Sequence, residues 1–143
     1  MKYLKNGLRN MHIKSLMYRL AYEKRLLETY YDKSFLHCTI TKAGKLSKLI
    51  CNIKCDLCGE QVKFKIIYDG ASPPRAWIKQ PQITNPQHIY PNDKSLCLYD
   101  PDTDEWTSES HLFDTFVPWC QQWFIFQRLY EQTGVWLHPE RYN

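Results

Sequence analysis

Residues 35–70 of the sequence are FLHCTITKAGKLSKLICNIKCDLCGEQVKFKIIYDG, in which three runs alternate between apolar and polar side chains. The apolar members of the runs are Leu36, Cys38 and Ile40, then Leu49, Cys51 and Ile53, and finally Val62, Phe64, Ile66 and Tyr68. An alternation with a period of two is typical of a strand that is buried on one face. Because the short turns KAGK and DLCGEQ join the runs, the segment predicts an antiparallel meander of three strands.

Helical patterns flank this meander. Residues 7–31 repeat apolar side chains at three- and four-residue spacing, which predicts an amphipathic helix. Its charged residues fall mostly on the remaining arc: Lys14, Arg19, Glu23 and Lys24. Residues 108–134 show a second helical pattern, with Ser108 as the expected cap and Gly134 as the expected stop. Pro118 lies inside this second pattern, where we expect it to kink or split the helix.

The segment between the meander and the second helical pattern is rich in proline. Residues 75–83 can form a fourth strand, which Pro81 confines to an edge of the sheet. Residues 84–108 show no periodic pattern, and a loop of this length is usually functional. The order of helix, meander, loop and helix predicts an α+β fold of one domain over residues 1–143, with the sheet packed on helices through one face.

Composition limits the class of protein. The chain has 143 residues, and no stretch approaches the 18 apolar residues that a membrane span needs. Its basic start lacks the apolar core of a secretory signal, so we expect a cytoplasmic protein whose six cysteines are thiols or metal ligands rather than disulfides. Residues 1–50 carry a net charge of +8 and residues 51–143 a net charge of −4. No recognised nucleic-acid motif accompanies the basic half, which argues against nucleic acid as a partner.

One cysteine lies in the long loop, within HIYPNDKSLCLYDP at residues 88–101. Leu96 and Leu98 flank Cys97, and they would hold the backbone while the thiol points elsewhere. A thiol can act as a nucleophile once it is ionised, and exchange between a thiol and a thioester needs no strong base. Buried structural cysteines are also common. From the local sequence alone, both interpretations of Cys97 stay open.

A second cysteine motif, KCDLCGE, favours a different chemistry. Cys55 and Cys58 have the spacing of half a zinc knuckle, and a redox pair or two plain thiols in a turn fit it too. No second pair with this spacing occurs among the other candidate ligands, which are His37, Cys38, Cys51 and Cys120. His111 and His138 could in principle pair with Cys97 as in a cysteine protease, but nothing in their spacing supports this.

The window from Pro73 to Gly134 resembles the ubiquitin-conjugating enzyme (UBC) family, with its Pro-rich loop, its motif that begins with histidine, its cysteine before leucine, and its tryptophan before a helix. It is still more similar to the bacterial ubiquitin-conjugating-like proteins that CBASS anti-phage operons encode beside cyclic-oligonucleotide synthases. Gln87 replaces the first proline of their pattern, and the segment before His138 is shortened. The matching residues are His88, Tyr90, Leu96, Cys97, Leu98, Tyr99, Pro101, Glu105, Trp106, Pro118, Trp119, Trp123, Thr133, Gly134, Trp136, His138 and Pro139.

This resemblance implies that Cys97 carries the C-terminal carboxylate of a protein as a thioester and passes it to an amine. His88 opens the motif and would hold the loop or act as a general base. The asparagine of the family's His-Pro-Asn motif is missing, since HIY stands in its place. Asn92 or the hydroxyl of Tyr90 would have to substitute for that asparagine.

The resemblance also implies partners. A cyclic-oligonucleotide synthase would be the donor or the target of conjugation, and an activating enzyme would dock on Lys5, Arg9 and Lys14 of the first helix. The alternative interpretation is that these charged residues only form a solvated face of the helix. Asp100 and Asp102 would orient the incoming amine, or they form a solvated acidic turn. No cofactor is implied, and the alternative function is a non-catalytic UBC-fold or zinc-stapled module that binds proteins.

Overall fold

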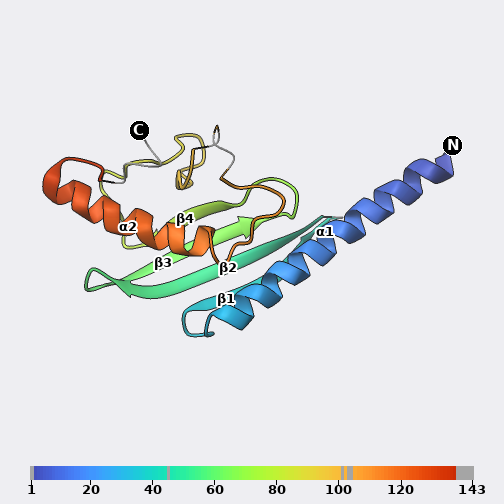
Figure 1. Ribbon diagram of the computed structural model, residues 1–143, viewed down its shortest axis with the longest axis horizontal. Coiled ribbons are helices and arrows are strands. Elements are labelled where there is room, and N and C mark those ends of the chain that lie inside the picture. Colours follow the sequence, from blue (N-terminus) through green and yellow to red (C-terminus); the bar gives the residue numbers. More distant parts are fainter. Residues whose placement is uncertain (1, 45, 101, 103–104, 138–143) are drawn as a thin grey trace.

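The computed structural model describes residues 2–44, 46–100, 102 and 105–137, apart from the side chains of residues 2–13 and 43. The described residues form two helices and four strands (Figure 1). In chain order these are α1 (Lys2–Tyr30), β1 (Leu36–Ala43), β2 (Leu46–Leu57), β3 (Glu60–Tyr68), β4 (Arg75–Gln80) and α2 (Phe116–Thr133). This is the α+β arrangement that the sequence predicts, with one helix, α2, described after the long loop.

The four strands form one antiparallel sheet in the order β1-β2-β3-β4. Cys58 and Gly59 make the tight turn between β2 and β3, and both have positive φ angles, of 54° and 76°. Two such residues give the turn a twist that matches the flanking strands. β4 lies at the edge of the sheet and ends at Gln80, directly before Pro81. The predicted meander and its edge strand are therefore confirmed, with β4 shorter than expected.

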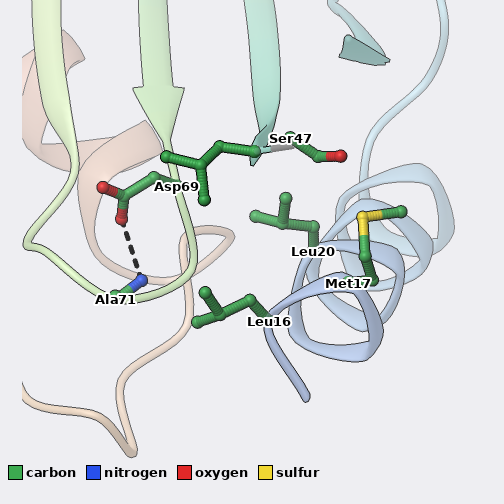
Figure 2. A pocket seen from close by; sticks show the side chains of 7 residues that line it. Leu16, Met17, Leu20, Ser47, Asp69 and Ala71 are labelled. Atoms are coloured by element: carbon green, nitrogen blue, oxygen red, sulfur yellow. Dashed lines mark hydrogen bonds between the residues drawn. The ribbon is translucent and has the colours of Figure 1, made fainter. Parts of the chain in front are cut away.

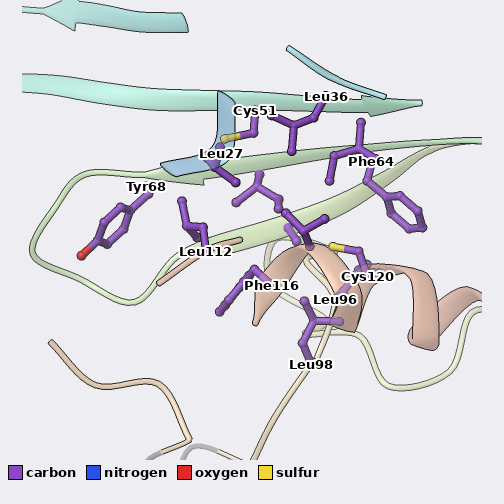
Figure 3. Close-up of a cluster of buried hydrophobic side chains, with 14 of the residues drawn as sticks. Leu27, Leu36, Cys51, Phe64, Tyr68, Leu96, Leu98, Leu112, Phe116 and Cys120 are labelled. Carbon is purple, nitrogen blue, oxygen red and sulfur yellow. The ribbon is translucent and has the colours of Figure 1, made fainter. Parts of the chain in front are cut away.

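The core lies on one face of this sheet (Figure 3). Inward-facing strand residues such as Cys51, Phe64 and Ile66 are at most 1% exposed. Both helices contribute to the same cluster, α1 through Leu20 and Leu27 and α2 through Phe116, Val117, Cys120, Trp123 and Phe124. The opposite face of the sheet presents exposed or partly exposed positions that alternate with the core positions along β2 and β3. The helices thus cover one face, as the one-sided alternation of the strands predicts.

Both helix boundaries differ from the predicted ones. α1 begins at Lys2, because residues 2–6 contain no helix-breaking proline or glycine. α2 begins at Phe116 rather than Ser108, so Pro118 occupies the first turn, where its missing N–H removes no helical hydrogen bond. The expected kink at Pro118 and the expected cap at Ser108 were therefore wrong. Gly134 ends α2 as predicted, with a left-handed φ of 75° and an N–H that donates to the Tyr130 carbonyl at 2.7 Å.

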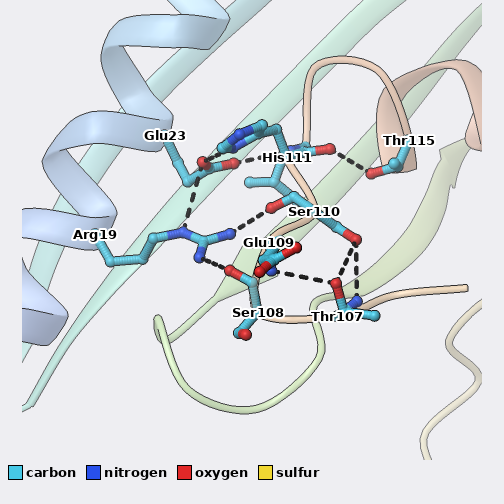
Figure 4. A network of polar contacts seen from close by, with 9 residues as sticks. Arg19, Glu23, Thr107, Ser108, Glu109, Ser110, His111 and Thr115 are labelled. Carbon is cyan, nitrogen blue, oxygen red and sulfur yellow. Dashed lines mark hydrogen bonds and ion pairs between the residues drawn. The ribbon is translucent and has the colours of Figure 1, made fainter. Parts of the chain in front are cut away.

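A buried carboxylate joins α1 to the segment before α2 (Figure 4). Glu23 is fully buried and accepts a hydrogen bond from the Leu112 N–H at 2.8 Å. Its other oxygen lies 2.7 Å from His111 Nδ1 and 3.5 Å from Arg19 Nε. The Arg19 guanidinium also donates to the carbonyls of Ser108 and Ser110. Placing Glu23 on the polar arc of the helix was therefore wrong, because the segment 107–115 folds over it.

The loop after β3 packs against α1 beside a small apolar pocket (Figure 2). The pocket encloses about 170 Å³ between α1 and the ends of β2 and β3, and Leu16, Met17 and Leu20 line its helical wall. Gly70 has a φ of 89°, and a Cβ at this position would lie 3.3 Å from the Leu16 carbonyl oxygen. The loop therefore needs glycine here, both for its backbone conformation and for its approach to α1.

Candidate active site around Cys97

Residues 88–97 form a small hairpin that presents Cys97 at its end. Ile89 and Leu96 make an isolated antiparallel bridge, and the Cys97 N–H donates to the His88 carbonyl at 2.8 Å. The Leu96 N–H donates to the Ala76 carbonyl at 2.7 Å, which ties the hairpin to β4. Leu96 and Leu98 are buried, so the backbone on both sides of Cys97 is anchored as the sequence predicts.

The tip of the hairpin is held by Asp93. Its Oδ1 accepts hydrogen bonds from the N–H of Ser95 at 2.9 Å and from the Ser95 hydroxyl at 2.6 Å. Its other carboxylate oxygen pairs with Arg75, and its carbonyl accepts from Trp77 Nε1 at 3.0 Å. The bonds from Ser95 and Arg75 hold the pKa of Asp93 below its usual value. The turn is therefore fixed to β4 by side-chain contacts as well as by the backbone.

α2 holds the other arm of the hairpin. Gln127 is fully buried, and its Oε1 accepts from the Gln87 N–H at 2.9 Å while its Nε2 donates to the Asn85 carbonyl at 3.1 Å. Trp123 Nε1 donates to the carbonyls of Gln87 at 3.0 Å and His88 at 3.3 Å. Because buried polar groups are costly to leave unpaired, these bonds fix the path of the chain that leads to His88.

Cys97 is partly buried, and its thiol contacts two oxygen atoms. Its Sγ donates to the Tyr99 carbonyl at 3.7 Å, and the Tyr90 hydroxyl donates to the sulfur. Burial raises the pKa of Cys97, the hydrogen bond from Tyr90 lowers it, and the charge of Asp100 raises it, with a net increase. Burial and the contact with Cys97 also raise the pKa of Tyr90. At neutral pH the sulfur is therefore mostly a protonated thiol, and Tyr90 is a neutral hydrogen-bond donor.

His88 contributes its backbone to the site. Its φ of 50° lies in the left-handed region, and its carbonyl accepts from both Cys97 and Trp123. Its ring packs against Trp136, with the ring centroids 4.4 Å apart. Burial lowers the pKa of His88, so the imidazole is uncharged at neutral pH.

Comparison with known protein families places this geometry in context. A model of the family described as type II CBASS E2 protein matches residues 23–143. The chain belongs to this family. This membership gives it an E2-like role in the CBASS system, and its two helices and four-strand sheet agree with the UBC-like fold. A search of curated proteins found no match to this sequence.

The structure locates the remaining predicted site residues of this E2 protein. Asn92 is exposed on the turn 91–93, whereas the half-buried Asp100 accepts a hydrogen bond from the exposed Asp102 N–H at 2.9 Å. Lys14 is exposed on α1. The side chains of Lys5 and Arg9, and all of Pro101, His138 and Pro139, lie outside the described residues. Of the two candidates to replace the missing asparagine, Tyr90 is the one whose side chain contacts the Cys97 sulfur.

The other cysteines lie apart from this site. Cys55 is half-buried on β2, and Cys58 is exposed at the tip of the hairpin between β2 and β3. Within residues 2–44, 46–100, 102 and 105–137, no group of three or more potential ligands is arranged to hold a metal ion. The sulfurs of Cys38 and Cys51 lie 3.7 Å apart in the core, and no disulfide joins the cysteines of the described chain. The geometry therefore gives no support to the zinc interpretation of Cys55 and Cys58.

Two residues that support the site have no place in the sequence predictions. Asp93 stands two residues before Ser95, a spacing that is typical of a local turn. Gln127 follows Trp123 by four residues, so it is a polar residue on the buried stripe of α2. Both signals were present in the sequence, but their partners, Arg75 and residues 85–87, are distant along the chain. No helix in the described part of the chain is long and apolar enough to span a membrane.

Proposed function

We propose that this E2 protein carries the C-terminal carboxylate of another protein as a thioester on Cys97 and transfers it to an amine. One observation carries the proposal most directly, which is the partly exposed Cys97 at the end of a braced hairpin with the Tyr90 hydroxyl beside its sulfur. A covalent carrier needs a reactive atom that is reachable and held still. We treat residues 1–143 as one ubiquitin-conjugating-like domain built around this atom.

In the charging step, the Cys97 thiol gives its proton to solvent and the thiolate attacks the carbonyl carbon of an activated C-terminus. That donor is a thioester or an acyl adenylate. A C–S bond to Cys97 forms, and the donor's thiolate or adenylate leaves with its electron pair. Because thiol–thioester exchange needs no strong base, the raised pKa of Cys97 slows this step without preventing it.

In the transfer step, an acceptor amine attacks the carbonyl carbon of the thioester. The C–N bond forms, the C–S bond breaks, and Cys97 departs as a thiolate. The Tyr90 hydroxyl, which already contacts the sulfur, donates to the oxyanion that develops on the adjacent carbonyl. The proton that the amine loses goes to the Asp100 carboxylate or to solvent. Tyr90 thus takes the place of the missing asparagine, and the exposed Asn92 does not.

His88 acts in this proposal as a positioning residue. Its carbonyl receives the Cys97 N–H, its ring packs on Trp136, and its imidazole is neutral. A general-base role for His88 would require its ring nitrogen to reach the amine, whereas its ring packs on Trp136 and its carbonyl holds the Cys97 backbone. We therefore assign His88 to loop geometry.

The family supports a partner within the CBASS system, and we propose the cyclic-oligonucleotide synthase encoded alongside as the donor or the target. An activating enzyme would supply the activated carboxylate and dock on the first helix, where Lys14 is exposed. The non-catalytic alternative keeps the same fold and partner but forms no covalent bond to Cys97.

The test is to express the chain with its neighbouring genes and to resolve the products on a denaturing gel without reductant. We expect an adduct that dithiothreitol removes and that Cys97→Ala abolishes. Cys58→Ala is the matched control, because Cys58 is exposed outside the site. An adduct that survives Cys97→Ala would contradict the proposal, and the absence of any adduct would favour the non-catalytic module.

A further inference from the structure

The uncovered face of the sheet carries a basic hollow. It has a volume of about 540 Å³ and is open to solvent where residues 33–37 meet β2, β3 and β4. Five lysines line it, namely Lys33, Lys54, Lys63, Lys65 and Lys79. No aspartate or glutamate of the described chain lines the hollow. None of the ion pairs in the described chain involves these five lysines. Asp32 directly precedes Lys33 and Asp56 follows Lys54 by two residues, but neither carboxylate lines the hollow.

The arrangement of the lysines lowers the stability of the sheet. Lys54 and Lys63 are direct partners across β2 and β3, and both are exposed. Like charges that face one another across an antiparallel pair destabilise it. Lys65 follows Lys63 on the same face, since alternate residues of a strand point the same way. An anionic ligand seated between these lysines would relieve the repulsion.

Two partly or fully exposed rings line the hollow beside the buried Phe64, and these two rings favour one kind of anion. Phe35 and His37 line it together with the lysines. Phe35 is half-buried and packs on Tyr31 with ring centroids 5.0 Å apart, whereas His37 is exposed. Surfaces that bind single-stranded nucleic acid combine cations for the phosphates with rings on which the bases stack. An acidic peptide would use the lysines, but its carboxylates offer no planar ring to stack on the exposed His37.

We propose that this basic hollow binds single-stranded nucleic acid, with lysines on the phosphates and His37 against a base. The residues come from the turn after α1 and from all four strands, so no contiguous sequence motif indicates this surface. The proposal does not use Cys97, so it is tested independently of thioester chemistry in the full chain that carries Cys97→Ala.

The probe is a fluorescein-labelled oligothymidylate of about 20 nucleotides, whose anisotropy reports binding at several salt concentrations. Each phosphate contact with a single strand adds about 0.7 to the slope of log affinity against log salt. Lys63→Gln with Lys65→Gln should therefore lower that slope by about 1.4. Where the parent and the variant have equal affinity near 1 M salt, this difference in slope makes the variant bind about 25-fold more weakly at about 0.1 M salt.

The matched control is Lys14→Gln with Lys24→Gln, which removes the same charge from α1. This control should bind within about twofold of the parent, since counterion release depends on the lysines that touch phosphate. His37→Ala should weaken binding by about fivefold or more, because it removes a stacking ring. The melting temperature of the Lys63/Lys65 variant should be unchanged or higher, which separates lost binding from lost folding.

Three outcomes would overturn the proposal. The first is no binding at low salt. The second is an equal loss of affinity in the α1 control, which would assign binding to general charge or to α1. The third is polyglutamate that competes as well as unlabelled oligothymidylate at equal charge, which would assign the hollow to acidic protein segments.

Discussion

The hydroxyl of Tyr90 donates a hydrogen bond to the sulfur of Cys97 from the opposite arm of the same hairpin. Burial raises the pKa of Cys97, and this bond partly offsets the increase. Asp100 acts in the other direction, because its negative charge disfavours the thiolate. The reactivity of the sulfur is therefore set by two neighbours with opposite effects.

Removal of the Tyr90 hydroxyl and removal of the Asp100 charge should shift the pKa of Cys97 in opposite directions. Tyr90→Phe should raise this pKa and slow alkylation by iodoacetamide at fixed pH, because the thiolate loses its donor. Asp100→Asn should lower the pKa and speed alkylation. Peptide-resolved mass spectrometry across a pH series provides the measurement, since exposed Cys58 also reacts. Asp102→Asn is the control, and shifts of the same sign in both test variants would contradict this account.

Gln127 should be needed for the geometry of the site although it is remote from the sulfur in sequence. Gln127→Leu leaves the Gln87 N–H and the Asn85 carbonyl without their partner, which should cost about 1–3 kcal/mol. Amide hydrogen exchange at residues 87–97 should accelerate, and transfer activity should fall. Gln122→Leu makes the same change at an exposed position of α2. Equal exchange in the two variants would show that Gln127 does not hold the hairpin.

Glu23 should stabilise the junction of α1 with residues 107–115. Glu23→Ala removes the acceptor for the Leu112 N–H and leaves Arg19 and His111 without their carboxylate. Because the Arg19 and His111 side chains are both partly exposed, we expect a loss of about 2–3 kcal/mol in the free energy of unfolding. Glu23→Gln keeps an acceptor for Leu112 and should lose roughly half as much. Urea denaturation measures both variants, and equal losses would argue against the role of this hydrogen bond.

Acid should open the Cys97 hairpin through Asp93. The pKa of Asp93 is lowered in the folded protein, so its contribution is complete above its unfolded pKa of about 3.9 and is lost as pH falls through the lower folded value. The indole N–H resonance of Trp77, which donates to the Asp93 carbonyl, reports the opening. We expect a constant signal from neutral pH down to about pH 4 and a change below it. In Asp93→Asn, persistence of the same acid transition would assign it to another group.

The sheet could be predicted from the sequence because its determinants are local. Cys38, Cys51 and Ile66 fall at every second position of their strands, and all three turn out to be buried. Helix periodicity was less reliable, since it assigned Glu23 to solvent. That residue is buried by His111 and Leu112, which are nearly ninety residues away. Pro118 was misjudged because its effect depends on the position at which α2 begins.

The residues of the candidate site also divide into those that a local motif predicts and those that only the fold brings together. Cys97, His88 and Tyr90 lie within one short motif, so the sequence and the resemblance to a family were enough to select them. Gln127 supports that motif from another element, and only the fold brings it close. The basic hollow is a stronger case, because Lys33, Lys54 and Lys79 belong to separate elements. The lack of a nucleic-acid motif therefore says little about such a surface.

The attachment site of the carried protein tests the central claim most directly. Cys97→Ser should trap the donor as an ester, since an oxygen ester is attacked by amines more slowly than a thioester. Mass spectrometry of this variant and of the parent protein should place the donor's C-terminal tail on residue 97 in both, through a bond that hydroxylamine cleaves. A tail linked to any other residue would contradict the account.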